Sequence, residues 1–322
     1  MTAVGVPSDL SLPFFAYGVF KSNELAWPRI RDVVDKVESS RLIDWVIRLR
    51  NGLPVLIAQP TGSVEGDCVH FLDPSAGYAA VGGSEPSGEY KWQTVSTETG
   101  IQCNALIAVK PNRGVSDEPI VSWTSADDPS FLHGMAAVAE AVTEVRASLI
   151  ENRPWLDTPS DWNAFFRLQG AFLVLWSIIE RLASFRFGAE FVQPGNSSTT
   201  TGKIYALATV VEFQEAMKKA KIRPQTIYSV RENRAKRTSS NGELEDPVRN
   251  TETTLKAWYQ IRSNITHRGK SAASDNTAVL NATVDLFNTT YNYLDLVVLG
   301  MKSKWETRDV CLLPQDMDEC NG

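Results

Sequence analysis

Apolar and polar residues alternate over the first third of the chain in the manner of β-strands. Runs rich in β-branched and aromatic residues are separated by Gly- and Pro-containing turn signals at 60–62, 81–83 and 98–100. One stretch, 26–39, has a helical pattern. We expect strands at 14–17, 53–59, 68–72, 92–96 and 102–109.

Further along, apolar residues recur at spacings of three and four, which is the period of an amphipathic helix. Asp128-Pro129 begins such a pattern, and Asp161 can cap the next one. Polar stretches at 195–203 and 229–250 are expected to be connections. We expect helices at 128–150, 162–187, 204–221, 251–266 and 278–302.

This pattern predicts an α+β protein of two domains joined near residues 152–155. Residues 11–150 form a β-rich domain with a trailing helix, and residues 155–304 form an all-α helical domain. Residues 305–322 are acidic and are expected to be a loosely held tail. A length of 322 residues suits two domains of ordinary size.

Composition favours a soluble protein of the cytoplasm. Hydrophobic residues make up 43% and charged residues 22% of the chain. No apolar run is expected to span a bilayer, and the N-terminus lacks the pattern of a secretory signal. The four cysteines have no metal-ligand spacing, so we expect reduced thiols, no metal and no cofactor.

Charge is unevenly distributed along the chain. Residues 1–154 hold 12 Lys and Arg against 19 Asp and Glu, a balance of −7, whereas residues 155–322 hold 20 against 19. Within 203–270 the count is 14 against 7, a balance of +7. The basic region favours a polyanionic partner, although solvated helix faces would give the same count.

The segment Trp258-Tyr-Gln-Ile-Arg-Ser-Asn-Ile-Thr-His-Arg-Gly269 contains one of only three histidines, with Arg262 five residues before His267 and Asn264 between them. An imidazole can accept the proton of a ribose 2′-OH, and a guanidinium can neutralise charge on phosphate. The pair therefore suits RNA cleavage without metal. The alternative is an exposed helix end whose cations interact with the helix dipole.

This segment resembles the Arg-x4-6-His signature of the HEPN superfamily. Residues 165–182 resemble the long family helix with an aromatic apolar face that ends in a Glu. The resemblance implies a metal-independent endoribonuclease that forms a homodimer through its helical domain, or a member that only binds nucleotide or RNA. It implies catalytic roles for Arg262, His267 and Asn264 and RNA contacts from Tyr259, Arg268 and Lys270.

On a continuous helix, five residues correspond to about 140° of rotation, so Arg262 and His267 would lie on different faces. They converge within one chain if the helix ends between them, and Gly269 is a plausible end. They also converge if two chains each supply one set, which is the arrangement that the HEPN resemblance implies.

The motif at 14–20, Phe-Phe-Ala-Tyr-Gly-Val-Phe, resembles the Tyr-Gly-Ser/Thr-Leu loop that opens the gamma-glutamylcyclotransferase-like fold. Later pieces at 62–67, 72–73 and 89–92 agree with that family. The resemblance implies a mixed β-barrel with a pocket for a small anionic ligand. Its candidate lining residues are Tyr17, Gly18, Val19, Phe20, Glu85 and Tyr90.

The family's catalytic Glu corresponds to Ala76, and Glu85 is a candidate substitute. Three roles therefore stay open for this domain: a tight turn without a site, a small-molecule sensor or protein-binding regulator, and a cyclotransferase with a dimerising helical domain. The hypothesis that combines both resemblances is an endoribonuclease restrained by a degenerate cyclotransferase-like domain, as in stress response or anti-phage defence.

Overall fold

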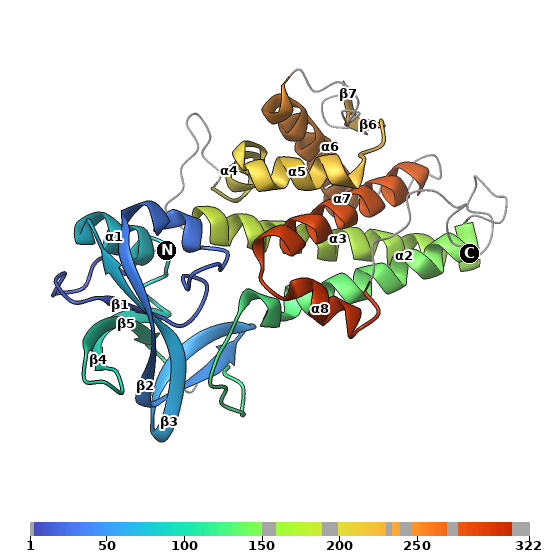
Figure 1. Cartoon of the computed structure of the whole chain (residues 1–322). Helices are drawn as coiled ribbons and strands as arrows, with labels where there is room; N and C mark the ends of the chain where they lie inside the picture. The colour runs from blue at the N-terminus through green and yellow to red at the C-terminus, as the bar shows by residue number, and fades with distance from the viewer. Residues whose placement is uncertain are drawn as a thin grey trace. The chain divides into compact units, whose positions relative to one another are not determined.

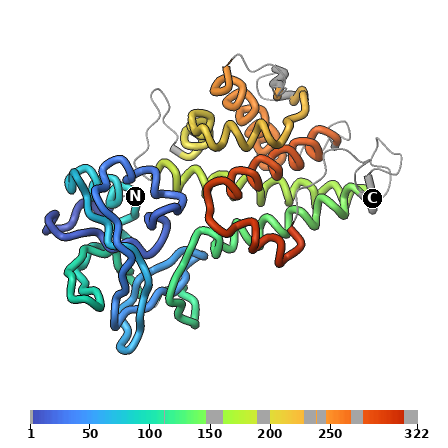
Figure 2. The backbone as a smooth tube through the Cα atoms, viewed as in Figure 1, coloured from blue at the N-terminus to red at the C-terminus, as the bar shows by residue number. Residues whose placement is uncertain are grey.

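The computed structural model describes residues 3–111, 113–149, 159–188, 199–229, 234–238, 246–268 and 276–310 (Figure 2). It is an α+β protein with two compact units. Unit 1 comprises Met1–Pro129 and Leu182–Thr199, and unit 2 comprises Ser130–Arg181 and Thr200–Gly322. The expected boundary at 152–155 lies outside the described residues. The helix that trails the first domain in sequence is grouped with unit 2.

Unit 1 contains a five-stranded sheet with the order β2-β3-β1-β5-β4 (Figure 1). β1 is parallel to β5, and the other pairs are antiparallel. β2 and β4 are the two edge strands of the sheet, and a closed barrel would need them to pair along their length. Within the described residues, one isolated bridge, Leu42 with Thr97, links β2 to the end of β4, so the expected barrel is not closed. The strands are β1 Phe14–Ala16, β2 Val34–Arg50, β3 Leu53–Phe71, β4 Tyr90–Ser96 and β5 Gln102–Ala108.

The helix expected at 26–39 is wrong. Two short 3-10 turns, Trp27–Arg29 and Arg31–Val33, lead directly into β2. Valines follow at 33, 34 and 37, and β-branched residues favour extended backbone. Tertiary pairing with β3 therefore outweighs the weak helical period of this stretch.

The turns expected at 60–62 and 81–83 are also wrong. Residues 60–62 lie inside β3. Thr61 there has positive φ, as does Asp44 opposite it on β2, and a shift in the strand register accommodates both residues. The Thr61 N–H donates to Asp44 Oδ1 at 2.9 Å. Residues 81–83 lie at the end of α1, Pro74–Gly82, which Asp73 caps by accepting from Ala76 N–H. The expected turn at 98–100 is confirmed, with Gly100 at φ +83°.

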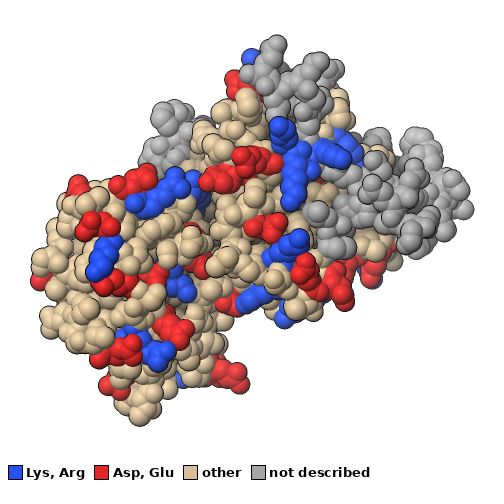
Figure 3. Space-filling model, viewed as in Figure 1, with Lys and Arg blue, Asp and Glu red and all other residues tan. Residues whose placement is uncertain are grey.

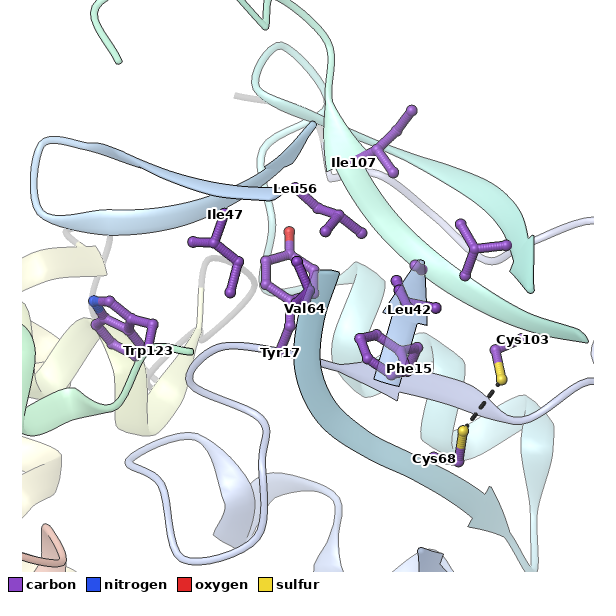
Figure 4. Close-up of a cluster of buried hydrophobic side chains, with 12 residues drawn as sticks. Phe15, Tyr17, Leu42, Ile47, Leu56, Val64, Cys68, Cys103, Ile107 and Trp123 are labelled. Atoms are coloured by element: carbon purple, nitrogen blue, oxygen red, sulfur yellow. Dashed lines mark hydrogen bonds between the residues drawn. The ribbon is translucent and has the colours of Figure 1, made fainter. Parts of the chain in front are cut away.

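The core of unit 1 lies against the inner face of the sheet (Figure 4). Phe15, Tyr17 and Leu56 are buried there. The thiols of Cys68 and Cys103 are free, as expected from the sequence, and lie 3.3 Å apart across β1.

Unit 2 is mainly helical. Its centre is α7, in which every residue from 282 to 294 is buried, and α5 packs along it. A π-helical turn, Ser130–Gly134, precedes α2. The helices are α2 Met135–Leu149, α3 Pro159–Phe187, α4 Thr199–Ala206, α5 Val211–Ala220, α6 Pro247–Arg268, α7 Asn276–Val297 and α8 Met301–Glu306 (Figure 1).

Three details of unit 2 differ from expectation. The helix at 204–221 is divided by a 3-10 turn, Leu207–Thr209. The helix at 278–302 is interrupted at Gly300, whose φ of +77° is left-handed. The connection at 229–250 contains part of a hairpin, with β6 Thr226–Ser229 paired to β7 Arg234–Arg237.

The loosely held tail from Trp305 onward is a wrong expectation where the structure describes it. Trp305 is fully buried and stacks on Tyr291, with ring centroids 4.2 Å apart. Its indole N–H donates to the carbonyl of Phe131 at 3.0 Å. An aromatic ring near a chain end can dock into a core, which the acidic character of the segment conceals. Residues 311–322 lie outside the described residues.

The expectation that no apolar run is long enough to span a bilayer is corrected by one helix. Residues 161–187 of α3 are long and apolar enough to cross a membrane by length and composition alone. Half of the most apolar window is buried inside the structure, and the core helix of a soluble protein passes the same test.

Candidate functional site

The motif lies on α6, which the sequence pattern places correctly. Asp246 precedes the helix and accepts from the Arg249 N–H at 3.0 Å, which satisfies one free donor of the first turn. Side chains at helical spacing form its buried face. These are Thr251, Thr254, Leu255, Trp258 and Ile261.

α6 continues without a break to Arg268, so the alternative in which the helix ends between Arg262 and His267 is excluded, and the structure leaves the helix to end close to Gly269. The two residues therefore lie about 140° apart around the helix axis of one protomer. The backbone of His267 and Arg268 belongs to the helix, and their side chains and Lys270 lie outside the described residues. Convergence of an Arg and a His on one face then needs a second copy of the chain.

Tyr259 links α6 to two other helices. Its half-buried ring lies 5.9 Å from the ring of Trp176 on α3 and 6.2 Å from that of Tyr205 on α4. The indole N–H of Trp176 donates to Glu180 at 2.9 Å. Tyr259, for which the resemblance implies an RNA contact, therefore also packs against neighbouring helices. Through this contact the two segments that resemble one family lie against each other.

Arg262 and Asn264 are both half-buried, on different flanks of α6. The amide of buried Gln260 donates to Asn264 Oδ1 at 2.7 Å, which fixes the orientation of Asn264 from within its own helix. Arg262 lies one turn after Tyr259. Among the described residues, no carboxylate forms an ion pair with its guanidinium.

The other two histidines have contacts away from this motif. His70 Nε2 lies 3.2 Å from a Glu38 carboxylate oxygen on the strand pair β2–β3. Exposed His133 Nδ1 lies 3.3 Å from a guanidinium nitrogen of Arg308. His133 therefore has an Arg neighbour and His70 a Glu neighbour, but neither lies in a segment that resembles the family, so His267 stays the candidate imidazole.

In unit 1 the 17–20 loop contributes to the core. Tyr17 and Phe20 are buried, and the Tyr17 hydroxyl donates to the Leu106 carbonyl at 2.6 Å. A side chain at Gly18 would meet the Pro54 ring at 2.9 Å, which explains a glycine there. Gly18 and Val19 are half-buried, so within residues 17–20 they are the two that reach solvent.

The charge of Glu85 acts on both candidate tyrosines, Tyr17 and Tyr90. Burial raises the pKa of Glu85 to about 7, and the positive charge of Arg29 opposes that rise. Burial also raises the pKa of Tyr17 and of Tyr90, and the charge of Glu85 adds to both effects. The Tyr90 hydroxyl donates to the Pro54 carbonyl at 3.4 Å. A carboxyl with a pKa near neutrality can take or give a proton.

Arg29 is a residue of this cluster that motif reasoning missed. Its guanidinium donates to the Ser84 hydroxyl and, at 3.2 Å, to the Ala80 carbonyl. Ala76, which stands where the family has its Glu, is exposed on the first turn of α1. No sequence spacing links Arg29 to Glu85, because α1 and β2–β3 separate them in the chain.

Charge and metal-ligand chemistry give the last features of the site. Acidic and basic side chains are interspersed on the face drawn in Figure 3, including the surface of unit 1. Among the described residues, no group of three or more His, Cys, Asp or Glu could hold a metal ion.

The comparisons of the chain with protein-family models, with curated proteins and with solved structures found no match.

Proposed function

We propose that the protein is a metal-independent endoribonuclease of the HEPN type. The observation that carries the proposal is the contact between Tyr259 of α6 and Trp176 of α3. It joins the helix that bears Arg262 and His267 to the aromatic helix that precedes it in the family pattern. The balance of +7 over residues 203–270 supports a polyanionic substrate.

In this reaction, His267 removes the proton from a ribose 2′-OH, and the 2′-oxygen attacks the adjacent phosphorus. The bond to the 5′-oxygen breaks, that oxygen takes a proton from solvent as it leaves, and the imidazolium returns its proton to solvent. Arg262 stabilises the charge on the pentacoordinate phosphate, while Asn264 orients the imidazole or contacts phosphate. The products are a 2′,3′-cyclic phosphate and a 5′-OH.

The site is composite in this proposal. Positions 262 and 267 lie about 140° apart around the axis of unbroken α6, so in this proposal one protomer supplies the Arg and its partner the His of each site. A two-fold dimer places both copies of each residue around one groove. The family resemblance gives Arg268 and Lys270 further contacts to RNA, and both are positively charged.

The test is incubation of the purified full chain with mixed cellular RNA in EDTA. Arg262→Ala and His267→Ala should each reduce cleavage about 10²–10⁴-fold. Arg31→Ala, an exposed residue of unit 1, and His133→Ala are matched controls that should keep full activity. Dependence on magnesium, or a 3′-OH product, would exclude the mechanism. RNA that is bound but never cut would support the binding-only alternative.

A second candidate concerns unit 1. Glu85, with its pKa raised to about 7 beside Tyr17 and Tyr90, favours a small-molecule site, as a sensor that gates the nuclease or as a cyclotransferase. Release of 5-oxoproline from a gamma-glutamyl dipeptide, lost in Glu85→Gln, would make unit 1 an enzyme. Ligand-dependent RNA cleavage without that product would make it a sensor.

A further inference from the structure

Two of the four cysteines form a pair of free thiols in the core of unit 1. Cys68 lies on β3 and Cys103 on β5, and their Sγ atoms lie 3.3 Å apart (Figure 4). β3 and β5 are not neighbours, because β1 lies between them in the sheet. In a flat sheet such strands are about 10 Å apart, so the curl of the sheet brings the two thiols together on its inner face.

The pair forms the last buried layer at one end of the core. Cys68 and Cys103 are themselves fully buried. Two positions further along the chain on the same face, His70 follows Cys68, and it forms a part-exposed ion pair with Glu38. On the other strand, Ile101 precedes Cys103 and is exposed. Solvent therefore lies one layer of side chains away, and a small oxidant reaches the thiols when this end of the core opens locally.

The two thiols have different surroundings. The hydrogen bond with Cys103 lowers the pKa of Cys68, and the Ser40 hydroxyl adds to that effect, while burial opposes it. The same hydrogen bond raises the pKa of Cys103, and burial raises it further. Because the thiolate and not the thiol attacks an oxidant, Cys68 is the attacking residue, and Cys103 is the neighbour that keeps its proton until the second step.

We propose that Cys68 and Cys103 are a redox modification site, at which a hydroperoxide converts the two thiols into an intramolecular disulfide. The formation of this bond brings the two sulfur atoms from 3.3 Å to about 2.0 Å. The proposal is independent of the proposed nuclease, because all of its groups lie in unit 1.

The reaction has two steps. The Cys68 thiolate attacks the terminal oxygen of the hydroperoxide, the O–O bond breaks, and a sulfenic acid forms. The hydroxide or alkoxide that leaves takes the proton that Cys68 gave up. The Cys103 sulfur then attacks the Cys68 sulfur, and the hydroxyl group of the sulfenic acid leaves as water with the Cys103 proton. Two thiols are thereby oxidised to one disulfide, and the hydroperoxide is reduced by two electrons.

The disulfide encloses residues 69–102. This loop contains α1 together with Glu85 and Tyr90 of the second candidate site. A cross-link over a long loop restricts the unfolded chain more than the folded one. The oxidised protein should therefore have a higher Tm than the reduced protein, with the segment that carries Glu85 tied to the sheet at both ends.

The test is peroxide treatment of the folded full chain in which Cys311 and Cys320 are changed to Ser. Catalase then removes the hydrogen peroxide, and polyethylene glycol maleimide labels the remaining thiols in urea. Both thiols should be labelled before treatment and neither after it. The intact mass should fall by two hydrogen atoms, and dithiothreitol should restore both labels.

Single variants test the separate roles of the two thiols. Cys103→Ser should form a sulfenic acid at Cys68 that dimedone captures, whereas Cys68→Ser should keep its thiol under the same treatment. Ser40→Ala removes the hydroxyl that lowers the pKa of Cys68, so it should slow oxidation. Ser39→Ala, at the neighbouring exposed position on the opposite face of β2, is the matched control and should not. Equal rates in these two variants would overturn the assignment of Cys68 as the attacking thiol.

Three outcomes would overturn the site itself. In the first, peroxide forms the disulfide in the urea-unfolded chain, while the folded chain keeps both labels, as an inert buried pair would. In the second, the product is a disulfide-linked dimer on a denaturing gel. In the third, both labels are lost and dithiothreitol does not restore them, which indicates oxidation beyond the sulfenic acid. All three are measured with the Cys68–Cys103 pair intact, so they stand if a single serine variant does not fold.

Discussion

Ionisation of Glu85 should make the stability of unit 1 depend on pH. Its pKa lies at about 7 in the fold, above the ordinary value of 4.5 that we take for the unfolded chain. One pKa unit corresponds to 1.36 kcal/mol, so ionising Glu85 costs about 3 kcal/mol more in the fold than in the unfolded chain.

The sign follows from proton linkage. Because the folded pKa is the higher one, the fold holds the proton more tightly than the unfolded chain does. The contribution of Glu85 is fully present below pH 4.5 and is lost as the pH rises through about 7. Glu85→Gln removes the ionisable group. As the pH rises through that window, the unfolding free energy of the variant minus that of wild type should therefore increase by at most about 3 kcal/mol.

The assay is urea unfolding of the full chain, followed by tryptophan fluorescence at pH 5 to 8.5. The quantity compared is the difference in unfolding free energy between Glu85→Gln and wild type at each pH. Glu98→Gln, an exposed carboxylate of unit 1, is the control and should run parallel to wild type. If Glu85→Gln also runs parallel to wild type, the carboxyl is hydrated in solution and the proposed proton-transfer site loses its basis.

Two more perturbations probe unit 2. Trp305→Ala removes the stack on Tyr291 and the indole hydrogen bond to the Phe131 carbonyl, and it leaves a cavity, so calorimetry should show a loss of about 3–5 kcal/mol. A change below about 1 kcal/mol would mean that the segment is detached in solution. Arg223→Met leaves buried Asp285 without its ion pair, 2.8 Å long, and should destabilise the chain by about 3–5 kcal/mol in urea unfolding. Adding Asp285→Asn should restore part of that loss.

Local sequence pattern predicts the elements whose signals are strong and continuous. α6 follows from apolar residues at 255, 258 and 261, and β5 follows from its buried run. The sequence analysis predicts no strand in the region of β2, because its 17 residues alternate irregularly around charges. The Asn51-Gly52 pair, with φ of +51° and +79°, marks the β2–β3 hairpin and is the turn signal that the sequence analysis missed.

The two candidate sites differ in how much of each the sequence alone predicts. The spacing of Arg262 and His267 identifies a candidate pair, but the continuity of α6 decides that one protomer does not bring them together. The cluster of Glu85 with Arg29 depends on contacts between segments far apart in the chain. Its raised pKa comes from burial, which spacing does not encode.

The apolar composition of α3 has one physical explanation. A surface helix of a monomer has a polar outer face, which lowers its mean hydropathy below that of a membrane span. α3 buries Phe172 and Trp176 on its inner face and carries Phe166 and Val174 on its outer face. Both faces are therefore apolar in the middle of the helix, and the segment resembles a membrane span in composition for that reason.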